Sequence, residues 1–481
     1  MTVSKLPTVL EGIVEGRRGH LPEIRERISH VDVSALPAST RSLYDGLRGR
    51  GRGEAAPAFI MECKSSSPSL GMIREHYEPG AIARIYSRYA SGISVLCEPD
   101  KFGGDYDHLA TVASSTHLPV LCKDFIVDEV QIHAARYFGA DAILLMLSVL
   151  TDEEYASLAA VAERYSLDIL TEVIDEDEVA RAVALGAKII GINHRNLHDL
   201  SIDLGRSARL SALLPADAVV VSESGIRDNA TVRELAGHSN AFLVGSQLTS
   251  QPDIDRAARE LVYGVNKVCG LTTPTAAQAA RAAGALYGGL VFEDASPRNV
   301  SRETAAEIIA HEPDLTYVAV SRRTDGYADL IQEGIGVVQV HAPYQGSTDA
   351  EIALLDAVTD NVPENVQVWR AVSMTGDHDG AALARALVES DSVDALVLDA
   401  GDGGTGTSFD WSGIPDDVKD ISFLAGGLTP DNLPAALAIG CNGLDLNSGV
   451  EYPGQAGRKD AGALRRAFET IRRFATPKDP S

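Results

Sequence analysis

Short apolar runs alternate with amphipathic segments along the whole chain. In the first half the apolar runs are AFIMECK, GISVLCEP, PVLCKDF, DAILLMLSV, DILTEV, KIIGINHRN, AVVVSESG and AFLVGSQ. The segments between them, such as DEVQIHAARYFGA, favour helix and end in a small Gly-Ala step, as helices that return to a strand often do. The pattern predicts parallel strands, each followed by a helix.

A second set of such runs begins at Val265 and matches the first in number. Its members are VNKVCGLT, LYGGLVFE, LTYVAVSR, GVVQVHA, VQVWRAVS, ALVLDAGD, SFLAGGL and GLDLNSGVE. An open sheet of about sixteen strands would exceed ordinary sheet sizes, whereas two closed barrels of roughly 200 to 250 residues each fit the usual barrel length. We therefore predict the α/β class, with two tandem (β/α)8 TIM barrels and an N-terminal helical extension before the first strand.

The junction between the two barrels lies in the segment DIDRAARELVYG. It is predicted to be the last helix of the first barrel, and it leads almost directly into the next strand without a Gly/Ser-rich or Pro-rich spacer. We place the junction near Gln251 to Gly264 and divide the chain into domains 1–255 and 256–481.

Composition narrows the range of partners. The formal net charge of -26 disfavours nucleic acid and anionic membranes. The cysteines are odd in number, scattered and free of C-x-x-C spacing, which indicates neither zinc nor a redox pair and fits a reducing cytoplasm. The N-terminus does not resemble a signal peptide, and no apolar run approaches the roughly 20 residues that span a bilayer. We expect a cytoplasmic, monomeric protein that binds small phosphorylated molecules.

Charged and polar side chains end most strands of the first barrel, at the edge where (β/α)8 barrels carry their chemistry. In chain order these residues are Glu62, Lys64, Glu98, Lys123, Asp124, Glu172, Asn193, Arg195, Glu223 and Ser224. Any single one could be a solvated loop residue or half of a structural ion pair. Together they are expected to converge on one mouth, where a mixture of opposite charges suits acid-base chemistry on an anionic substrate.

Small residues after the last strands indicate a phosphate site in each barrel, because exposed backbone N–H groups bind anions there. In the first barrel these residues are Gly225, Gly245 and Ser246, with the hydroxyl-rich loop Ser65 to Ser69 after the first strand. In the second barrel they are Gly426, Gly427, Ser448 and Gly449. Glycine alone often marks only a tight turn, so the signal is of intermediate specificity.

The second barrel ends its first strand with Cys269 and its sixth with Asp399, which opens the loop DAGDGGTG. A lone buried cysteine is usually just a small hydrophobic residue. A thiolate that faces a carboxylic acid, however, suits proton transfer at neighbouring carbons. The glycine run does not open a first βαβ unit, which disfavours dinucleotide binding.

At these residues the chain resembles a known fusion family, in which indole-3-glycerol-phosphate synthase is followed by phosphoribosylanthranilate isomerase. The synthase half of the resemblance rests on FIMECKSSSPSLG, LCKDF, LTEV, GINHRNL and VSESGI. The isomerase half rests on VCGLT, GGLVFEDASPRNV, VQVHA, WRAVS, LVLDAGDGGTGTSFDW, FLAGGLTPDN and NSGVEYPGQAGRKD. The match covers nearly the whole chain and departs from the family pattern at Cys97 and Asn266, which carry no implied catalytic role.

For the first barrel the resemblance implies that Lys123 acts as general acid on the keto oxygen of the substrate. Lys64 would pair with the carboxylate that leaves, and Glu172 would serve in dehydration. The remaining implied residues would orient the lysines and the substrate or hold the phosphate. They are Glu62, Asn193, Glu223, Ser67, Arg195, Ser224, Gly225, Gly245 and Ser246.

For the second barrel the resemblance implies that Cys269 is the general base and Asp399 the general acid of an aldose-to-ketose rearrangement. Arg298 would hold the anthranilate carboxylate, and the phosphate would bind at the glycine and serine residues named above. The resemblance implies no metal and no organic cofactor. We expect the intermediate to diffuse freely between the two sites.

Three alternative functions stay open at this stage. Lys64 or Lys123 could be the Schiff-base nucleophile of an aldolase. One barrel could be an inactive scaffold that only stabilises the other. The second barrel could be the related sugar isomerase of histidine biosynthesis, although that enzyme is expected to have an aspartate where Cys269 stands.

Overall fold

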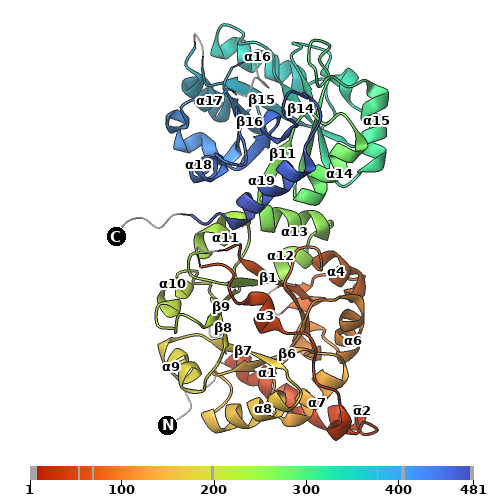
Figure 1. The fold of residues 1–481 in the computed structure, drawn as a ribbon, viewed down its shortest axis with the longest axis vertical. Helices are drawn as coiled ribbons and strands as arrows, with labels where there is room; N and C mark the ends of the chain where they lie inside the picture. The colour runs from red at the N-terminus through yellow and green to blue at the C-terminus, as the bar shows by residue number, and fades with distance from the viewer. Residues whose placement is uncertain are drawn as a thin grey trace. The chain divides into compact units, whose positions relative to one another are not determined.

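The computed structural model describes residues 8–52, 55–67, 70–196, 200–375, 378–401 and 407–476. The chain forms two compact units that divide between Leu261 and Val262. Each unit contains one closed barrel of parallel strands (Figure 1). The predicted pair of tandem (β/α)8 barrels is therefore confirmed.

The first barrel closes in the order β1-β10-β9-β8-β7-β6-β5-β4, with every neighbouring pair parallel. Its strands are β1 (Ala58–Cys63), β4 (Gly92–Leu96), β5 (Val120–Lys123), β6 (Ala142–Met146), β7 (Asp168–Val173), β8 (Ile189–Asn193), β9 (Val219–Glu223) and β10 (Ala241–Val244). A short antiparallel hairpin of β2 (Ser66–Ser67) and β3 (Gly71–Met72) follows β1. Because the strands are parallel, their carboxyl ends share one rim, as the sequence predicts.

Helices connect these strands, and several begin at side chains that accept backbone N–H groups. Asp128 and Gln131 form a capping box at α7, and Thr151 and Glu154 form one at α8. The helices of this unit are α1 (Thr8–Gly19), α2 (Leu21–Arg27), η1 (Val33–Ala35), α3 (Leu43–Leu47), α4 (Pro79–Tyr86), α5 (Pro99–Phe102), α6 (Tyr106–Ser115), α7 (Glu129–Tyr137), α8 (Asp152–Arg164), α9 (Glu176–Ala184), α10 (Arg206–Ser211), α11 (Asn229–Leu235), α12 (Ser246–Thr249) and α13 (Ile254–Tyr263).

The N-terminal extension packs on the first barrel as predicted. Leu10 and Val14 of α1 and Leu43 of α3 belong to one buried apolar cluster with the strand residues Ile60 and Leu144. Burial of a leucine or valine side chain contributes roughly 1.5–3 kcal/mol. Apolar burial therefore holds the extension against the barrel.

The second barrel closes in the order β11 to β18, with β11 paired to β18. Its strands are β11 (Val265–Val268), β12 (Tyr287–Val291), β13 (Thr316–Ser321), β14 (Ile335–Val340), β15 (Gln367–Ser373), β16 (Ala395–Asp399), β17 (Ser422–Leu424) and β18 (Gly443–Leu446). Its helices are α14 (Pro274–Ala283), α15 (Arg302–His311), η2 (Tyr327–Leu330), α16 (Thr348–Thr359), α17 (Gly380–Glu389), η3 (Trp411–Gly413), η4 (Asp416–Ile421), α18 (Leu433–Ala438), η5 (Ser448–Val450) and α19 (Ala461–Arg473).

Aromatic side chains fill part of the interior of the second barrel. Trp369 stacks on Phe423 with ring centroids 4.5 Å apart, and Tyr287 meets Trp369 edge to face at 4.9 Å. These rings lie against the apolar side chains that line the strands. The barrel interior is therefore a packed core, and the open space lies above it at the carboxyl ends of the strands.

No helix in the described ranges is both long and apolar enough to cross a bilayer.

Candidate active sites

A cavity of about 420 Å³ opens at the carboxyl ends of the first barrel's strands. The predicted residues that line it are Glu62, Lys64, Ser67, Lys123, Glu172, Asn193, Arg195, Ser224, Gly225, Gly245 and Ser246. Of the other predicted strand-end residues, Asp124 also lines the cavity, whereas Glu223 contacts one of the lining lysines instead. The structure therefore brings side chains from widely separated parts of the sequence into one site.

Two lysines and two glutamates form a connected ion-pair network in this cavity. Lys123 Nζ lies 2.9 Å from Glu223 Oε2 and 3.4 Å from Glu62 Oε2, and Lys64 Nζ lies 2.8 Å from Glu62 Oε1. Burial raises the pKa of Glu62, but the charges of Lys64 and Lys123 have the larger effect and hold that pKa at about 2. Burial also acts against the Lys123 ammonium, yet Glu223 and Glu62 raise the pKa of Lys123 well above its usual range. Both members of the Lys123–Glu62 pair are charged at neutral pH.

Glu172 is the carboxyl group of this cavity that keeps a proton. Burial raises the pKa of Glu172 to about 8, and the nearby charge of Glu223 acts in the same direction. Asn193 Nδ2 donates to Glu172 Oε1 over 3.1 Å and fixes the orientation of the carboxyl group. A carboxyl group that is protonated near neutral pH can act as a general acid.

Glycines provide the space that the charged side chains occupy. A Cβ at Gly191 would lie 2.1 Å from Glu223 Oε1, and one at Gly245 would lie 2.4 Å from Glu62 Oε1. Ser224 and Gly225 both have positive φ, at 67° and 77°, where the chain turns after β9. Of these positions, Ser224, Gly225 and Gly245 line the cavity, and Gly225 and Gly245 are among the residues predicted to hold a phosphate.

The apolar wall of the cavity includes residues that sequence reasoning missed. Val9, Leu10 and Ile13 of α1 line it, together with Phe102 of α5. The extension was predicted only to pack on the barrel. Its apolar helical face was the available signal, but that face does not reveal which end of the barrel the helix covers.

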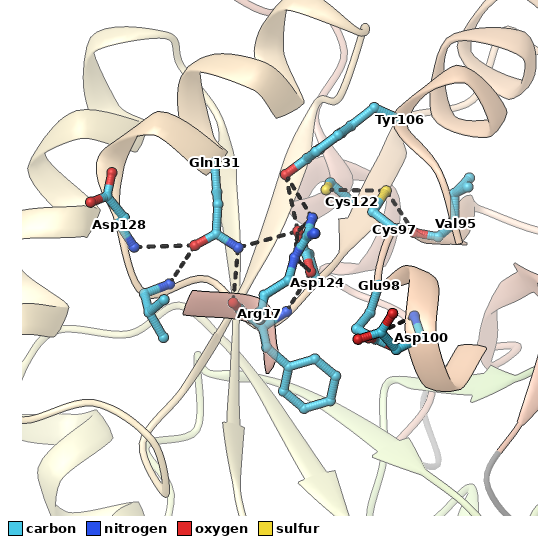
Figure 2. Close-up of polar contacts among 12 residues, drawn as sticks. Arg17, Val95, Cys97, Glu98, Asp100, Tyr106, Cys122, Asp124, Asp128 and Gln131 are labelled. Carbon is cyan, nitrogen blue, oxygen red and sulfur yellow. Dashed lines mark hydrogen bonds and ion pairs between the residues drawn. The ribbon is translucent and has the colours of Figure 1, made fainter. Parts of the chain in front are cut away.

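A buried ion pair ties α1 to the strand end that carries Lys123 (Figure 2). Arg17 Nε lies 2.8 Å from Asp124 Oδ1, and its terminal nitrogen lies 2.6 Å from Asp124 Oδ2. Tyr106 and Gln131 also donate to Asp124 Oδ2. Asp124 reaches the mouth as predicted, but its carboxylate is engaged in this pair.

The expectation that Glu98 faces the mouth is wrong. Its carboxylate accepts the backbone N–H groups of Asp100, Lys101 and Phe102 and so caps α5. Figure 2 shows the carboxylate beside Asp100. Glu98 is 1% exposed and is not among the residues that line the cavity. A capping carboxylate satisfies helix N–H groups that otherwise have no partner, and this local requirement determines where Glu98 points.

A second cavity, of about 320 Å³, opens at the carboxyl ends of the second barrel's strands. The predicted residues that line it are Cys269, Arg298, Asp399, Gly426, Gly427 and Ser448. Gly449 does not line it. A Cβ at Gly449 would lie 1.9 Å from the backbone oxygen of Leu428, so this glycine permits two loops to approach closely.

The thiol of Cys269 lies beside a buried lysine that sequence reasoning missed. Lys267 Nζ donates to Asp445 Oδ2 over 2.7 Å and to Gln339 Oε1 over 2.6 Å. Burial raises the pKa of Cys269, while the Lys267 ammonium opposes that rise. Lys267 precedes Cys269 by two residues, and side chains two apart share a strand face, so the spacing could have revealed it.

Asp399 faces the same cavity from β16. Burial raises the pKa of Asp399 to about 6, although its Oδ1 accepts the N–H of Ala400 over 2.7 Å. In a fraction of the molecules the Asp399 carboxyl group is therefore protonated close to neutral pH. Cys269 and Asp399 therefore line one cavity, as the sequence predicts.

Arg298 is already paired in this structure. Its Nε and one terminal nitrogen each lie 2.9 Å from a carboxylate oxygen of Glu451, and Lys459 Nζ lies 2.8 Å from Glu451 Oε1. A substrate carboxylate that binds Arg298 must therefore share the guanidinium with Glu451 or displace Glu451 from it.

Two stretches of the predicted loops, residues 68–69 and 402–406, lie outside the described residues.

Two (β/α)8 barrels, each with a charged, glycine-bordered cavity at its strand ends, define a two-site enzyme. The family model of indole-3-glycerol phosphate synthase matches residues 10–261, and that of N-(5'-phosphoribosyl)anthranilate isomerase matches residues 266–470. The chain belongs to the family that joins these two enzymes of tryptophan biosynthesis, with the synthase N-terminal and the isomerase C-terminal.

Relatives match over nearly the full length. The tryptophan biosynthesis protein TrpCF of Corynebacterium glutamicum is 72% identical over 98% of this chain and 100% of its own length. The protein of the same name from Salmonella typhi is 47% identical over 91% of this chain and 93% of its own. Among solved structures, phosphoribosyl anthranilate isomerase from Thermus thermophilus is 28% identical over 43% of this chain and 98% of that one, with a TM-score of 0.37.

Proposed function

We propose that the second barrel acts first on N-(5-phosphoribosyl)anthranilate and the first barrel acts on its product. The second barrel opens the ribose and rearranges the aldose to 1-(2-carboxyphenylamino)-1-deoxyribulose 5-phosphate. The first barrel closes this ketose to indole-3-glycerol phosphate with loss of carbon dioxide and water. The Lys123–Glu223–Glu62–Lys64 network supports the synthase step most directly, because it offers one cation to the keto oxygen, where negative charge develops during ring closure, and a second cation to the substrate's carboxylate.

In the second barrel, Asp399 donates a proton to the ribose ring oxygen, and the bond from that oxygen to the anomeric carbon breaks to give an imine. Cys269 then removes the proton from the neighbouring carbon, and the resulting enol tautomerises to the ketose. The pKa of Asp399 near 6 supports its role, since an acid that titrates near the working pH transfers protons well. Arg298 binds the anthranilate carboxylate in this scheme, and the phosphate lies at Gly426, Gly427 and Ser448.

In the first barrel, Lys123 protonates the keto oxygen while the aromatic carbon attacks the carbonyl carbon. Lys64 pairs with the carboxylate until carbon dioxide leaves. Glu172, which holds a proton at neutral pH, assists departure of the hydroxyl group as water. The Glu172 carboxylate then removes one proton from the neighbouring CH2 group, which forms the indole double bond and restores the acid. Glu62, Asn193 and Glu223 orient these groups, and the residues that hold the substrate and its phosphate are Ser67, Arg195, Ser224, Gly225, Gly245 and Ser246.

Each cavity has its own acid-base groups and its own glycine-bordered loops. Each barrel can therefore work alone, and we propose that the intermediate passes through bulk solution. The same proposal includes a monomer in the cytoplasm that needs no metal or organic cofactor. For the domains we keep the boundary of the sequence analysis, 255 and 256, as a proposal about where the two activities can be separated.

The test is a time course with N-(5-phosphoribosyl)anthranilate, in which substrate, ketose and indole-3-glycerol phosphate are followed together by mass spectrometry. Wild type should form the ketose transiently. Lys123→Met should accumulate the ketose, and Asp399→Asn should leave the substrate unchanged. An equimolar mixture of the two variants should restore the final product. Final product from Lys123→Met alone would contradict the assignment of the first barrel.

A further inference from the structure

His194 lies between two residues of the synthase cavity, Asn193 and Arg195, but its side chain faces away from that cavity. Successive strand residues point to opposite faces, so Asn193 at the end of β8 faces the mouth and His194 faces the helix layer. The imidazole is 0% exposed. The mechanism above gives this buried titratable group no role.

The imidazole lies at the head of a chain of buried hydroxyl groups. Its Nε2 is 2.6 Å from Ser207 Oγ of α10, which is 2.6 Å from Ser222 Oγ of β9, which is in turn 2.6 Å from Ser239 Oγ. His194, Ser207, Ser222 and Ser239 are each 0% exposed. At its other nitrogen, His194 Nδ1 lies 2.9 Å from the backbone oxygen of Ser224.

The carbonyl of Ser224 fixes the direction of every bond in this chain. A carbonyl oxygen only accepts, so Nδ1 carries the proton and donates. Burial lowers the pKa of His194 despite its bond to that carbonyl, so the imidazole is neutral at neutral pH and Nε2 accepts from Ser207. Ser207 then accepts from Ser222, and Ser222 accepts from Ser239.

The bond to Ser224 constrains the peptide that leads to Gly225. Ser224 has a φ of 67°, a left-handed conformation that an ordinary L-residue seldom adopts. In a trans peptide the carbonyl oxygen and the following N–H point in opposite directions. When the oxygen of Ser224 points to buried His194, the N–H of Gly225 points toward the cavity that both residues line.

We propose that His194 is a positioning residue of the synthase, which locks the Ser224–Gly225 peptide so that the Gly225 N–H is presented to the substrate's phosphate group. This inference rests on the phosphate position proposed above. His194 touches neither substrate nor reacting atoms and acts through the backbone of Ser224. Its contribution is therefore to binding of the phosphorylated substrate and not to the proton transfers.

A matched pair of variants separates the hydrogen bond from packing. Asparagine and leucine have nearly the same shape, but His194→Asn keeps an N–H donor close to the place of Nδ1, and His194→Leu has none. We expect His194→Leu to raise both the synthase KM and the inhibition constant of inorganic phosphate about tenfold, the size expected for loss of one hydrogen bond to a charged group. The synthase kcat should change less than about threefold, and His194→Asn should stay within about threefold of wild type in KM.

The isomerase KM of the same protein sample is the internal control, because His194 lies in the other unit. Equal KM values for His194→Leu and wild type, or equal impairment of both variants, would overturn the inference. Ser246→Ala tests the phosphate site itself. If it leaves phosphate inhibition unchanged, the proposed phosphate position is wrong. If it weakens inhibition while His194→Leu does not, only the positioning role is wrong.

A measurement on the wild-type chain covers the case in which His194→Leu does not fold. The ¹⁵N spectrum of histidine-labelled protein, assigned by comparison with His194→Asn, reports which ring nitrogen carries the proton. A proton on Nδ1 supports the inference. A proton on Nε2 would contradict it, because the bond to the Ser224 carbonyl could not then exist.

Discussion

Lys123 Nζ lies 2.9 Å from Glu223 Oε2, a contact between residues that are 100 positions apart in the sequence. Glu223 does not line the cavity, whereas Lys123 does. The Glu223 carboxylate therefore contacts Lys123 from outside the cavity lining. It holds the ammonium in one place and favours its charged form.

Replacement of Glu223 by glutamine should weaken this hold without loss of the side chain's shape. We expect Glu223→Gln to lower the synthase kcat by about 10- to 100-fold, because small misplacement of a catalytic group has effects of this size. Steady-state kinetics of both reactions provide the measurement, and the isomerase rate is the control. An unchanged synthase kcat would contradict the positioning role of Glu223.

Gly191 should tolerate no side chain, because a Cβ there would lie 2.1 Å from Glu223 Oε1. Gly191→Ala is expected to displace Glu223 and to reduce the synthase rate at least as much as Glu223→Gln. The matched control is Gly12→Ala in α1, where a Cβ meets nothing within 4 Å. Alanine at an open helical position should stabilise by roughly 0.5–1 kcal/mol. Similar rates for the two alanine variants would argue against the steric explanation.

Removal of Arg17 should destabilise the first barrel, because it leaves the Asp124 carboxylate buried without its cation. The two side chains are 3% and 0% exposed, and loss of one partner from such a pair costs about 3–5 kcal/mol. Arg17→Met should shift urea-induced loss of synthase activity by an amount in this range. Arg25→Met is the control, since the Arg25–Asp128 pair is 53% and 26% exposed and should contribute less than about 1 kcal/mol. Equal shifts in the two variants would contradict this account.

The synthase rate should depend on the proton of Glu172. The group's pKa is about 8, so kcat should fall as the pH rises through about 8 and the general acid is lost. The pKa is raised above the ordinary 4.5, so the folded state binds the proton more tightly than the unfolded state does. Stability of the first barrel should therefore decline as the pH rises from about 4.5 to about 8.

Glu172→Gln is the control for both pH effects. It should remove this part of the pH dependence of stability and lower the synthase rate at every pH. A wild-type kcat that is flat between pH 7 and 9 would contradict the assignment.

Lys267 should control the acidity of Cys269, since the lysine ammonium opposes the rise that burial imposes on the pKa of the thiol. Lys267→Met is expected to raise that pKa further and to lower the isomerase kcat/KM. The pH profile of Cys269 alkylation by iodoacetamide reports the thiol pKa directly. An unshifted alkylation profile, with the synthase rate intact, would show that Lys267 only fills space.

Most of the fold followed from local pattern. Two closed barrels were predicted from apolar runs of strand length, from helices that end in Gly-Ala steps, and from two successive sets with the same number of strands. The structure has both barrels. The site residues followed from the barrel rule that strand carboxyl ends share a rim. Lys64, Lys123 and Glu172 line one cavity, and Cys269 and Asp399 line the other.

The placement of a side chain could not be predicted where its partners are far away in the sequence, or where a nearby helix terminus needs it as a hydrogen-bond acceptor. Glu98 and Glu62 are both glutamates near the end of a strand, and the sequence does not distinguish them. The carboxylate of Glu98 caps α5, however, because the N–H groups of that short helix need an acceptor. The α1 wall of the synthase cavity is tied to the barrel by the Arg17–Asp124 pair as well as by apolar burial, and the members of that pair are 107 positions apart.

The two barrels, their order and the residue types at each mouth can be predicted from the amino-acid sequence, because strand and helix periodicity and the chemistry of strand-end residues are local properties. Which charges neutralise one another, which carboxyl groups keep a proton and which buried histidine holds a loop become visible in the folded chain. Those outcomes depend on desolvation and on distances of about 3 Å between groups that closure of the barrel brings together, and no local pattern encodes such distances.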